Sequence, residues 1–294
     1  MFKNIFITGS TGFVGINCIN YFKTNYSFSL YNKNEKDFII NEDIVLHLAG
    51  KAHDLKNEFN INEYYEVNTE LTKVIFDKFL KSNSKVFIFL SSVKAVIDND
   101  IENLSEDTIP NPKSHYGKSK LLAEQYILSK NNSGKRVYIL RPCMIHGPNN
   151  KGNLNLLYKY IIKGMPWPLG FFENKRSFCS IDNLCFILAE LLHNELIPSG
   201  IYNIADDVPL STNDVIKLMT KSKGIKNNIW YINKRFINTV AKFGNLFNFP
   251  FNTDKLSKLT EIYVVNTSKI KKYINHPLPI SSSDGLIKTF QSFN

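Results

Sequence analysis

The stretch Ile5-Phe6-Ile7-Thr8-Gly9-Ser10-Thr11-Gly12-Phe13-Val14-Gly15 decides the fold of this chain. An apolar run is followed by three spaced glycines and then by apolar residues at helical spacing. This order predicts a strand, a tight turn at Gly9 and a helix; Gly12 lets the backbone approach a diphosphate, and Gly15 lets the helix pack close to the sheet. The start of that helix offers free N–H groups and a positive dipole end to phosphate. The stretch therefore predicts a dinucleotide site.

Strand-like and helical patterns alternate through the first half of the chain. Strands are expected at 5–7, 28–31, 44–48, 86–90 and 137–140, and helices at 13–24, 63–82 and 116–130. This alternation predicts an α/β fold, a doubly wound parallel sheet with helices on both faces. Further helices are expected at 153–163, 183–193 and 211–222. We expect a cofactor-binding domain at 1–150 and a smaller C-terminal substrate lobe mainly at 151–294, with some segments returning to the sheet.

The composition is that of an ordinary globular protein, with 43% hydrophobic and 21% charged residues. No apolar run approaches the ~20 residues of a membrane span, and no signal peptide precedes the first expected strand, so we expect a cytoplasmic protein. The four cysteines show no C-x-x-C spacing and no matching histidine cluster. This pattern indicates reduced core thiols and no metal site.

The formal charge of +10 is concentrated in one region. Residues 220–275 contain eleven Lys or Arg and two acids. One interpretation is a patch for polyanions or anionic lipid; we favour a solvated surface, and no signature of a nucleic-acid-binding protein is present. Within this region, residues 234–247 are amphipathic at helical spacing. A weak membrane-surface contact is one hypothesis for them, and a core helix of the second lobe is the favoured one.

The region that would hold the adenosine half of a dinucleotide is short. Only twelve residues separate Tyr31 from Ile44, too few for another strand–helix crossover. Asn32 and Lys33 follow the second expected strand, where an acid would bind the ribose 2′-OH of NAD. This arrangement mildly favours NADP over NAD. Asp37 is a candidate for the adenine edge, with a solvated loop acid as the alternative.

Tyr116 and Lys120 lie one helical turn apart on a common face of an expected helix. A phenol with a pKa of ~10 is a poor base, and lowering that pKa to ~7 takes about 4 kcal/mol of preferential phenolate stabilisation. A nearby ammonium and an oxidised nicotinamide supply charge of the required sign. Tyr116 is therefore a candidate acid or base toward a carbinol. Ser91-Ser92, directly after an expected strand, offer a hydroxyl to the same oxygen, or cap a turn.

Together these motifs resemble an extended short-chain dehydrogenase/reductase of the NAD-dependent epimerase/dehydratase family. The matching segments are Thr8–Gly15, His47-Leu48-Ala49-Gly50, Asn68 with Thr72, Ser92 with Tyr116 and Lys120, Gly164-Met165-Pro166, and Arg176-Ser177-Phe178 through Asp182-Asn183. The resemblance runs from residue 3 to about residue 290. It implies a Rossmann cofactor domain, a smaller sugar-nucleotide lobe, a nucleotide-sugar substrate for which we expect a UDP link, and a homodimer.

The resemblance also implies roles for particular residues. The candidate cofactor-binding residues are Gly9, Thr11, Gly12, Phe13, Val14, Gly15, Leu48, Ala49, Gly50, Asn68, Ser91, Tyr116 and Lys120, with Asn32 and Asp37 added from the strand-end argument. The catalytic candidates are Ser92, Tyr116 and Lys120, and the substrate-binding candidates are Ser92, Lys151, Asn153 and Arg176. Cations and amides at the last three positions suit a diphosphate, although a solvated loop lysine is the alternative for Lys151. For His47 and His146, at strand ends, packing is favoured over catalysis.

Departures from the family pattern reduce the number of reactions that this chain is expected to catalyse. Val93-Lys94 stand where sugar 4,6-dehydratases carry an Asp-Glu pair, so the acid and base for water elimination are missing. Arg141-Pro142-Cys143-Met144 lacks the Asn with which UDP-hexose 4-epimerases contact substrate. Ser91–Lys94 and residues 141–153 instead resemble the branch of UDP-4-keto-6-deoxy-N-acetylhexosamine 4-reductases.

We therefore expect an enzyme that moves hydride at C4 of a nucleotide-linked sugar with NAD or NADP, and no metal. The leading hypothesis is reduction of a UDP-4-keto-(6-deoxy)-N-acetylhexosamine in surface polysaccharide synthesis. The first alternative is a 4-epimerase of UDP-hexoses or UDP-N-acetylhexosamines with bound NAD. A non-catalytic NAD(P)-binding protein is the second, and the presence of both Tyr116 and Lys120 argues against it.

Overall fold

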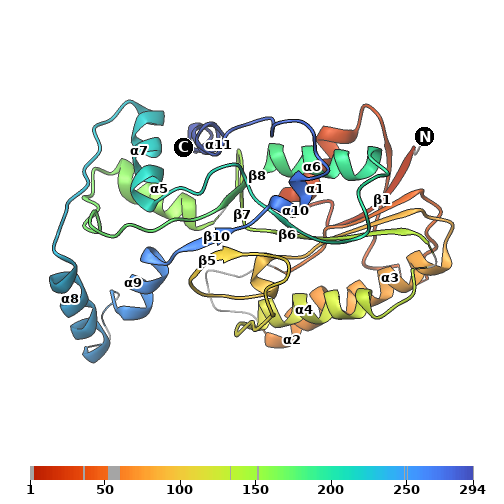
Figure 1. The fold of residues 1–294 in the computed structure, drawn as a ribbon, viewed down its shortest axis with the longest axis horizontal. Helices are drawn as coiled ribbons and strands as arrows, with labels where there is room; N and C mark the ends of the chain where they lie inside the picture. Colours follow the sequence, from red (N-terminus) through yellow and green to blue (C-terminus); the bar gives the residue numbers. More distant parts are fainter. Residues whose placement is uncertain are drawn as a thin grey trace.

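The computed structural model describes residues 3–35, 37–51, 60–132, 134–150, 152–247, 249 and 251–293. Its central element is a six-stranded sheet with the strand order β2-β1-β3-β4-β6-β9 (Figure 1). The strands are β1 (Asn4–Thr8), β2 (Ser27–Leu30), β3 (Ile44–His47), β4 (Val86–Leu90), β6 (Arg136–Pro142) and β9 (Gly200–Ile204). Every neighbouring pair is parallel. The expected doubly wound α/β fold is confirmed.

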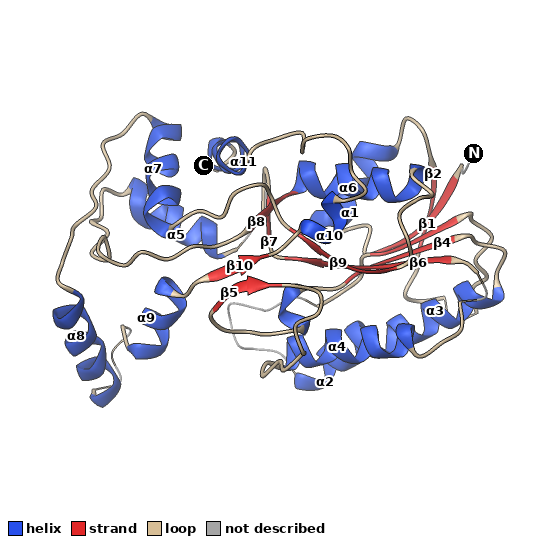
Figure 2. Cartoon of the chain, in the orientation of Figure 1, coloured by secondary structure: helices blue, strands red, loops and turns tan. Residues whose placement is uncertain are grey.

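Helices cover both faces of this sheet (Figure 2). Helices α1 (Phe13–Phe22) and α6 (Ile181–His193) pack on one face, and α3 (Leu71–Lys81) and α4 (His115–Leu128) pack on the other. Successive side chains of a strand point to opposite faces of the sheet. Ile5 and Ile7 therefore pack in the core on the side of α1 and α6, and Phe6 packs in the core on the side of α3 and α4. Both faces are buried, which explains why the strands read as continuous apolar runs.

A loop joins β2 to β3, across β1, without a helix or strand among its described residues. Its buried Phe38 stacks on Phe6 with ring centroids 5.6 Å apart, and Ile40 is buried in the same cluster. These two side chains cover part of the face that a crossover helix would otherwise bury. The prediction that this region is too short for another strand–helix unit is confirmed.

The expected helix at 63–82 is divided into three parts. It consists of α2 (Ile61–Tyr65), a π-helical turn at Glu66–Glu70 and α3. The π turn contains Asn68, whose buried amide donates to Lys51 O at 3.1 Å and to Ser119 Oγ at 3.0 Å. Turns of this kind often occur at functional sites because they redirect a side chain out of the regular helical rows. Periodicity alone did not predict this interruption.

A second lobe has its own apolar core, seen on the left of Figure 1. Its helices are α5 (Asn153–Ile162), α7 (Thr212–Lys223), α8 (Lys234–Leu246), α9 (Thr253–Thr260) and α11 (Ser282–Gln291). Two small parallel pairs, β7 (Met144–His146) with β8 (Phe178–Ser180) and β5 (Ile101–Leu104) with β10 (Tyr263–Val265), lie between the lobe and the sheet. Because β9 and α6 belong to the sheet layers, the chain returns there after residue 151; the boundary at residue 150 stays a prediction.

The remaining helix is α10 (Ser268–Lys271). Cys18, Cys143, Cys179 and Cys185 are all buried and free. Within the described ranges, no helix combines the length and the apolar composition needed to cross a membrane. In the same ranges, no three His, Cys, Asp or Glu side chains are grouped so as to hold a metal ion.

Candidate active site

The turn between β1 and α1 is built around two glycines that cannot be replaced without movement. Gly9 has a φ of +72°, and a Cβ there would lie 2.7 Å from Ala49 N. A Cβ on Gly15 would lie 2.1 Å from Gly9 O and 2.8 Å from Ser10 Cα. Gly15 therefore lets the helix approach the turn itself, rather than the body of the sheet as the sequence predicted.

The amino-terminal end of α1 is open to an anion. Gly12 is its N-cap residue and has no side chain to cap the helix, and the first turn of α1 carries no acid. The uncapped N–H groups and the positive end of the helix dipole favour a phosphate at this position. The turn and the helix start therefore fit the diphosphate of a dinucleotide.

A cavity of about 340 Å³ joins this turn to the predicted catalytic residues. It is lined by Gly9, Gly12, Phe13, Val14, Gly15, Leu48, Gly50, Lys51, Leu90, Ser91, Ser92, Tyr116, Lys120, Pro142, Cys143 and Ile145. Most of the predicted cofactor residues and all three predicted catalytic residues thus surround one space. They meet because the loops after β1, β3, β4 and β6 all leave the carboxyl edge of the parallel sheet.

Lys120 is buried on α4 and points to the end of β4. Its Nζ donates a hydrogen bond to Leu90 O at 2.9 Å and lies 4.8 Å from the centre of the Phe89 ring. A Cβ on Gly50 would lie 2.8 Å from this Nζ, so glycine keeps the ammonium accessible from the cavity. Burial lowers the pKa of Lys120 to about 8, and the nearby Glu124 carboxylate partly opposes that shift.

Tyr116 lies one turn before Lys120 and beside Ser92. Burial raises the pKa of Tyr116, and a hydrogen bond with the Ser92 side chain acts in the opposite direction. Ser92 also caps the turn that follows β4, because its Oγ accepts from Lys94 N at 3.2 Å. A Cβ on Gly117 would lie 2.3 Å from Lys94 O, so glycine allows the start of α4 to pack against this turn. That close contact fixes the relative positions of Ser92 and Tyr116.

A buried polar network beneath the cavity was not predicted from the sequence. Ser91 Oγ donates to Glu124, and the carboxylate of Glu124 accepts from Arg141 Nε at 3.0 Å and from Arg141 Nη2 at 2.5 Å. Glu124 and Arg141 are 1% and 3% exposed. The signal that could have identified Glu124 is its spacing, since Tyr116, Lys120 and Glu124 repeat every four residues along one face of α4.

His47 is also part of a buried chain of hydrogen bonds. Thr8 Oγ1 lies 2.6 Å from Nδ1, and Thr72 Oγ1 lies 2.8 Å from Nε2. Thr72 donates its own hydroxyl hydrogen to Asn68 O, so it accepts from Nε2–H, and Thr8 donates to Nδ1. Burial and the Lys120 charge lower the pKa of His47 to about 3. His47 therefore stays neutral and ties β1, β3 and α3 together. The other strand-end histidine, His146, is buried between Thr289 and Asp206.

Several predicted residues do not line this cavity. Asn32 is exposed and accepts from Asn34 N at 3.0 Å, Asp37 is exposed, and Asn153 is exposed at the start of α5. Arg176 forms a 2.9 Å ion pair with Glu261, so contact with a substrate would require that pair to open. Thr11 and Ala49 belong to the adjoining loops without lining the space, and Asn68 lies behind Gly50. Lys151 lies outside the described residues.

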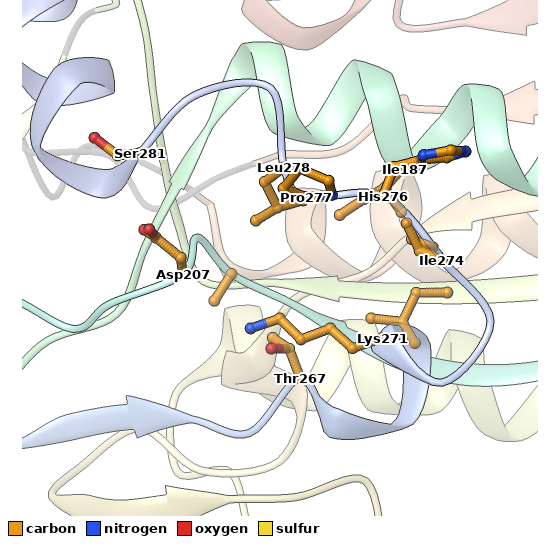
Figure 3. Close-up of a pocket in the computed structure, with 11 residues that line it drawn as sticks. Ile187, Asp207, Thr267, Lys271, Ile274, His276, Pro277, Leu278 and Ser281 are labelled. Carbon is orange, nitrogen blue, oxygen red and sulfur yellow. The ribbon is translucent and has the colours of Figure 1, made fainter.

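A second cavity, of about 400 Å³, lies between α6, the end of β9 and α10 (Figure 3). Ile187, Ile274 and Leu278 form its apolar walls, and Lys271 and Asp207 are its charged side chains. It contains none of Ser92, Tyr116 and Lys120. The predicted catalytic residues instead line the smaller cavity above the glycine turn.

This chain is similar in sequence and in fold to known nucleotide-sugar enzymes. The UDP-glucose 4-epimerase of Vibrio cholerae is 28% identical over 99% of this chain and 95% of that protein. The N-acetyl-alpha-D-glucosaminyl-diphospho-ditrans,octacis-undecaprenol 4-epimerase of Escherichia coli O157:H7 is 26% identical over 93% of this chain and 86% of that protein. The solved UDP-glucuronic acid 4-epimerase of Bacillus cereus in complex with NAD superposes with a TM-score of 0.74 at 19% identity, covering 99% of this chain and 98% of that chain.

The sequence profile of the NAD dependent epimerase/dehydratase family matches residues 5–205. That range contains the glycine turn, the cavity above it, Ser92, Tyr116 and Lys120, and all six strands of the sheet except Asn4, the first residue of β1. The chain is an enzyme, and it belongs to the NAD-dependent epimerase/dehydratase family of extended short-chain dehydrogenases/reductases.

Proposed function

We propose that this enzyme is a C4-epimerase of a UDP-linked hexose or N-acetylhexosamine and works with bound NAD. The observation that carries the proposal is the convergence of Ser92, Tyr116 and Lys120 on the cavity that also holds the glycine turn. Two relatives that align with more than nine tenths of the chain are named as sugar 4-epimerases. Their names support epimerisation rather than the reduction favoured from the sequence motifs.

Features of the cavity support a nicotinamide dinucleotide as the bound cofactor. Gly9 and Gly15 allow the tight turn before α1, Gly12 leaves room for a diphosphate at the start of that helix, and Gly50 leaves Lys120 accessible for ribose hydroxyls. When bound, NAD accepts a hydride from a carbinol carbon and can return it to the resulting ketone.

Tyr116 exchanges the proton of the C4 hydroxyl in the proposed mechanism. Its phenolic oxygen takes the proton as the carbinol is oxidised and returns it when the ketone is reduced. Ser92 donates a hydrogen bond to the C4 oxygen and holds it beside Tyr116. For net epimerisation, the 4-keto sugar turns so that hydride returns to its other face.

Lys120 stabilises the ionised form of Tyr116. Its pKa of about 8 leaves it largely protonated at neutral pH, and it lies one helical turn from the phenol. A cation in a buried site favours a nearby phenolate and so lowers the cost of removing the tyrosine proton. The hydrogen bond to Leu90 O fixes the ammonium at the end of β4.

A second candidate is an NADPH-dependent reductase of a UDP-4-keto sugar. The observation in its favour is that the exposed Asn32 and Lys33, rather than an acid, stand directly past the end of β2. A lysine in this position suits the 2′-phosphate of NADP.

One experiment separates the two candidates. The purified enzyme is heated to release bound dinucleotide, which is identified, and fresh enzyme is incubated with UDP-GlcNAc or UDP-glucose without added cofactor. An epimerase releases NAD and converts each substrate to a mixture with its C4 epimer, with no net change in reduced nicotinamide. A preparation that forms no epimer but consumes NADPH with a UDP-4-keto sugar would establish the reductase instead.

A further inference from the structure

Helix α8 exposes an apolar face at the end of the lobe, far from the sheet (Figure 1). Its exposed side chains include Phe236 at 60%, Phe243 at 56% and Leu246 at 73%, and the face continues through Phe247 at 60%. Phe236, Val240, Phe243 and Phe247 are spaced by three or four residues, which puts them in one stripe along the helix. Single exposed apolar residues are common on proteins, but a contiguous aromatic stripe marks a contact surface.

The stripe is separate from the face with which α8 packs on the protein. Ile237 and Ala241 are buried in the core of the lobe. A Cβ on Gly244 would lie 1.9 Å from Phe251 O, so the helix is held close to the following segment on that side. At 100° per residue, the stripe lies roughly a quarter turn from this buried face. Packing inside the lobe therefore accounts for one apolar face of α8 and leaves the other uncovered.

Cations flank the exposed stripe. Arg235 and Lys242 are exposed and lie beyond Leu246, on the side of the stripe away from the buried face. Residues 226–258 as a whole contain six Lys or Arg and one acid, Asp254. An aromatic face bordered by basic residues is the pattern of a helix lying in the plane of an anionic membrane surface.

Aromatic residues next to α8 extend this pattern. Phe247 and Phe249 stack with ring centroids 5.8 Å apart just past its end, and Phe249 is 58% exposed. Trp230 and Tyr231, shortly before its start, are 51% and 58% exposed. Aromatic rings with a polar edge are favoured at the boundary between lipid and water. The thirteen residues of α8 are too few to span a bilayer, which fits a helix lying on its surface.

We propose that α8, with the aromatic residues that flank it, docks this enzyme on the surface of an anionic phospholipid bilayer. The apolar stripe enters the boundary between headgroups and acyl chains, and Arg235 and Lys242 contact lipid phosphates. The proposal is independent of which sugar the enzyme converts.

The test uses full-length enzyme and vesicles of phosphatidylcholine, alone or with an equal part of phosphatidylglycerol. The enzyme should sediment with the anionic vesicles and not with the neutral ones, and high salt should weaken the binding. The chain has two tryptophans; Trp167 is buried, and Trp230 is exposed. Binding should therefore shift the fluorescence of Trp230 to shorter wavelength.

Two double variants test the two parts of the surface. Phe243→Gln/Phe247→Gln should weaken binding about tenfold by removing apolar contact, and Arg235→Gln/Lys242→Gln about thirtyfold by removing two charges. Leu196→Gln and Lys81→Glu are the matched controls, because Leu196 is 83% exposed outside the lobe and Lys81 ends α3. Both controls should bind as the parent does, and all variants should keep the parent's turnover of soluble UDP-sugar.

Three results would overturn the proposal. One is equal sedimentation with neutral and anionic vesicles, or with neither. Another is undiminished vesicle binding by both double variants. The third is an oligomer of the parent that the phenylalanine variant dissociates, because the stripe would then be covered by a second copy of this chain.

Discussion

The two sides of this enzyme are built in different ways. At the carboxyl edge of the sheet, His47, Lys120 and Glu124 are buried and hydrogen-bonded to other parts of the protein. On the lobe, Asn153 is exposed and Arg176 is paired with Glu261 away from the cavity. The side that holds the proposed catalytic residues is therefore preorganised, whereas Asn153 and Arg176 of the lobe stand apart from those residues. Substitutions on the two sides should therefore change activity and stability by very different amounts.

The largest difference between the two sides is expected in kcat when a tyrosine hydroxyl is removed from each. Tyr116→Phe removes the hydroxyl that we propose exchanges a proton with the C4 oxygen, so kcat should fall by about 10²–10⁴. The matched change in the lobe is Tyr160→Phe, which removes a hydroxyl that donates to Pro166 O. It should leave kcat within about twofold. Steady-state kinetics with UDP-sugar measure both, and unchanged turnover by the Tyr116 variant would refute its role as acid and base.

Glycine-to-alanine changes should also separate the two sides. In Gly15→Ala the new Cβ meets Gly9 O at 2.1 Å, so the turn must shift; we expect a loss of about 2 kcal/mol in unfolding free energy and at least about tenfold in NAD affinity. In Gly152→Ala, in the lobe, the new Cβ meets no atom within 4 Å among the described residues beyond its chain neighbours, and the change should be nearly neutral. Urea denaturation and NAD titration of the two variants test this. Equal affinities would show that the turn does not hold the dinucleotide.

The buried ammonium of Lys120 should set the alkaline limit of activity. Its pKa of about 8 means that it is charged below this pH and neutral above it. We expect kcat/KM to fall about tenfold per pH unit above pH 8, as the charge that stabilises the Tyr116 phenolate is lost. A profile that stays level to about pH 10 would contradict the assignment.

The same lysine should lower the free energy of unfolding at neutral pH. Its pKa in the folded protein lies below the ordinary value of 10.5, so the unfolded chain binds the proton more tightly and stability rises with pH between the two values. Lys120→Met should therefore raise the free energy of unfolding at pH 7, by up to about 3 kcal/mol, while activity is lost. Denaturation at pH 7 and at pH 10 measures this difference, which should shrink at the higher pH.

The smallest effect on catalysis is expected for substitution of Arg176. Arg176→Gln breaks the ion pair with Glu261, and we expect a loss of about 2 kcal/mol in stability with KM for UDP-sugar changed less than about threefold. Glu261→Gln breaks the same ion pair but leaves the hydrogen bonds that Arg176 donates to Lys258 O and Glu261 O, and KM should again change less than about threefold. A tenfold rise in KM confined to the arginine variant would return Arg176 to the substrate site that its sequence context indicates.

The fold was predictable because it depends on local patterns. Apolar runs, glycine spacing and the short segment after Tyr31 each determine the structure of their own surroundings, and the sheet brings Gly9, Ser92 and Tyr116 together by a general rule for parallel strands. The buried pairing of Glu124 with Arg141 and the chain through His47 were not predicted. They join residues far apart in sequence, and a sequence does not show which partner a buried polar group will find.

The arrangement of the lobe was less predictable for a similar reason. Residues 234–247 have apolar side chains for two faces, and the sequence alone does not show which face meets the core. The structure buries Ile237 and Ala241 and leaves Phe236 and Phe243 exposed. The favoured hypothesis of a core helix therefore describes only one side of α8.

The row of Tyr116, Lys120 and Glu124 on α4 also limits how this protein can evolve. Each residue of an α-helix turns the chain by about 100°, so inserting or deleting one residue between Tyr116 and Lys120 would carry the lysine off the cavity face. Loops of the lobe can gain or lose residues without moving the reactive groups. Members of a lineage built on this plan can therefore change substrate through length variation in the lobe, while α4 tolerates exchanges of side chains and not changes of length.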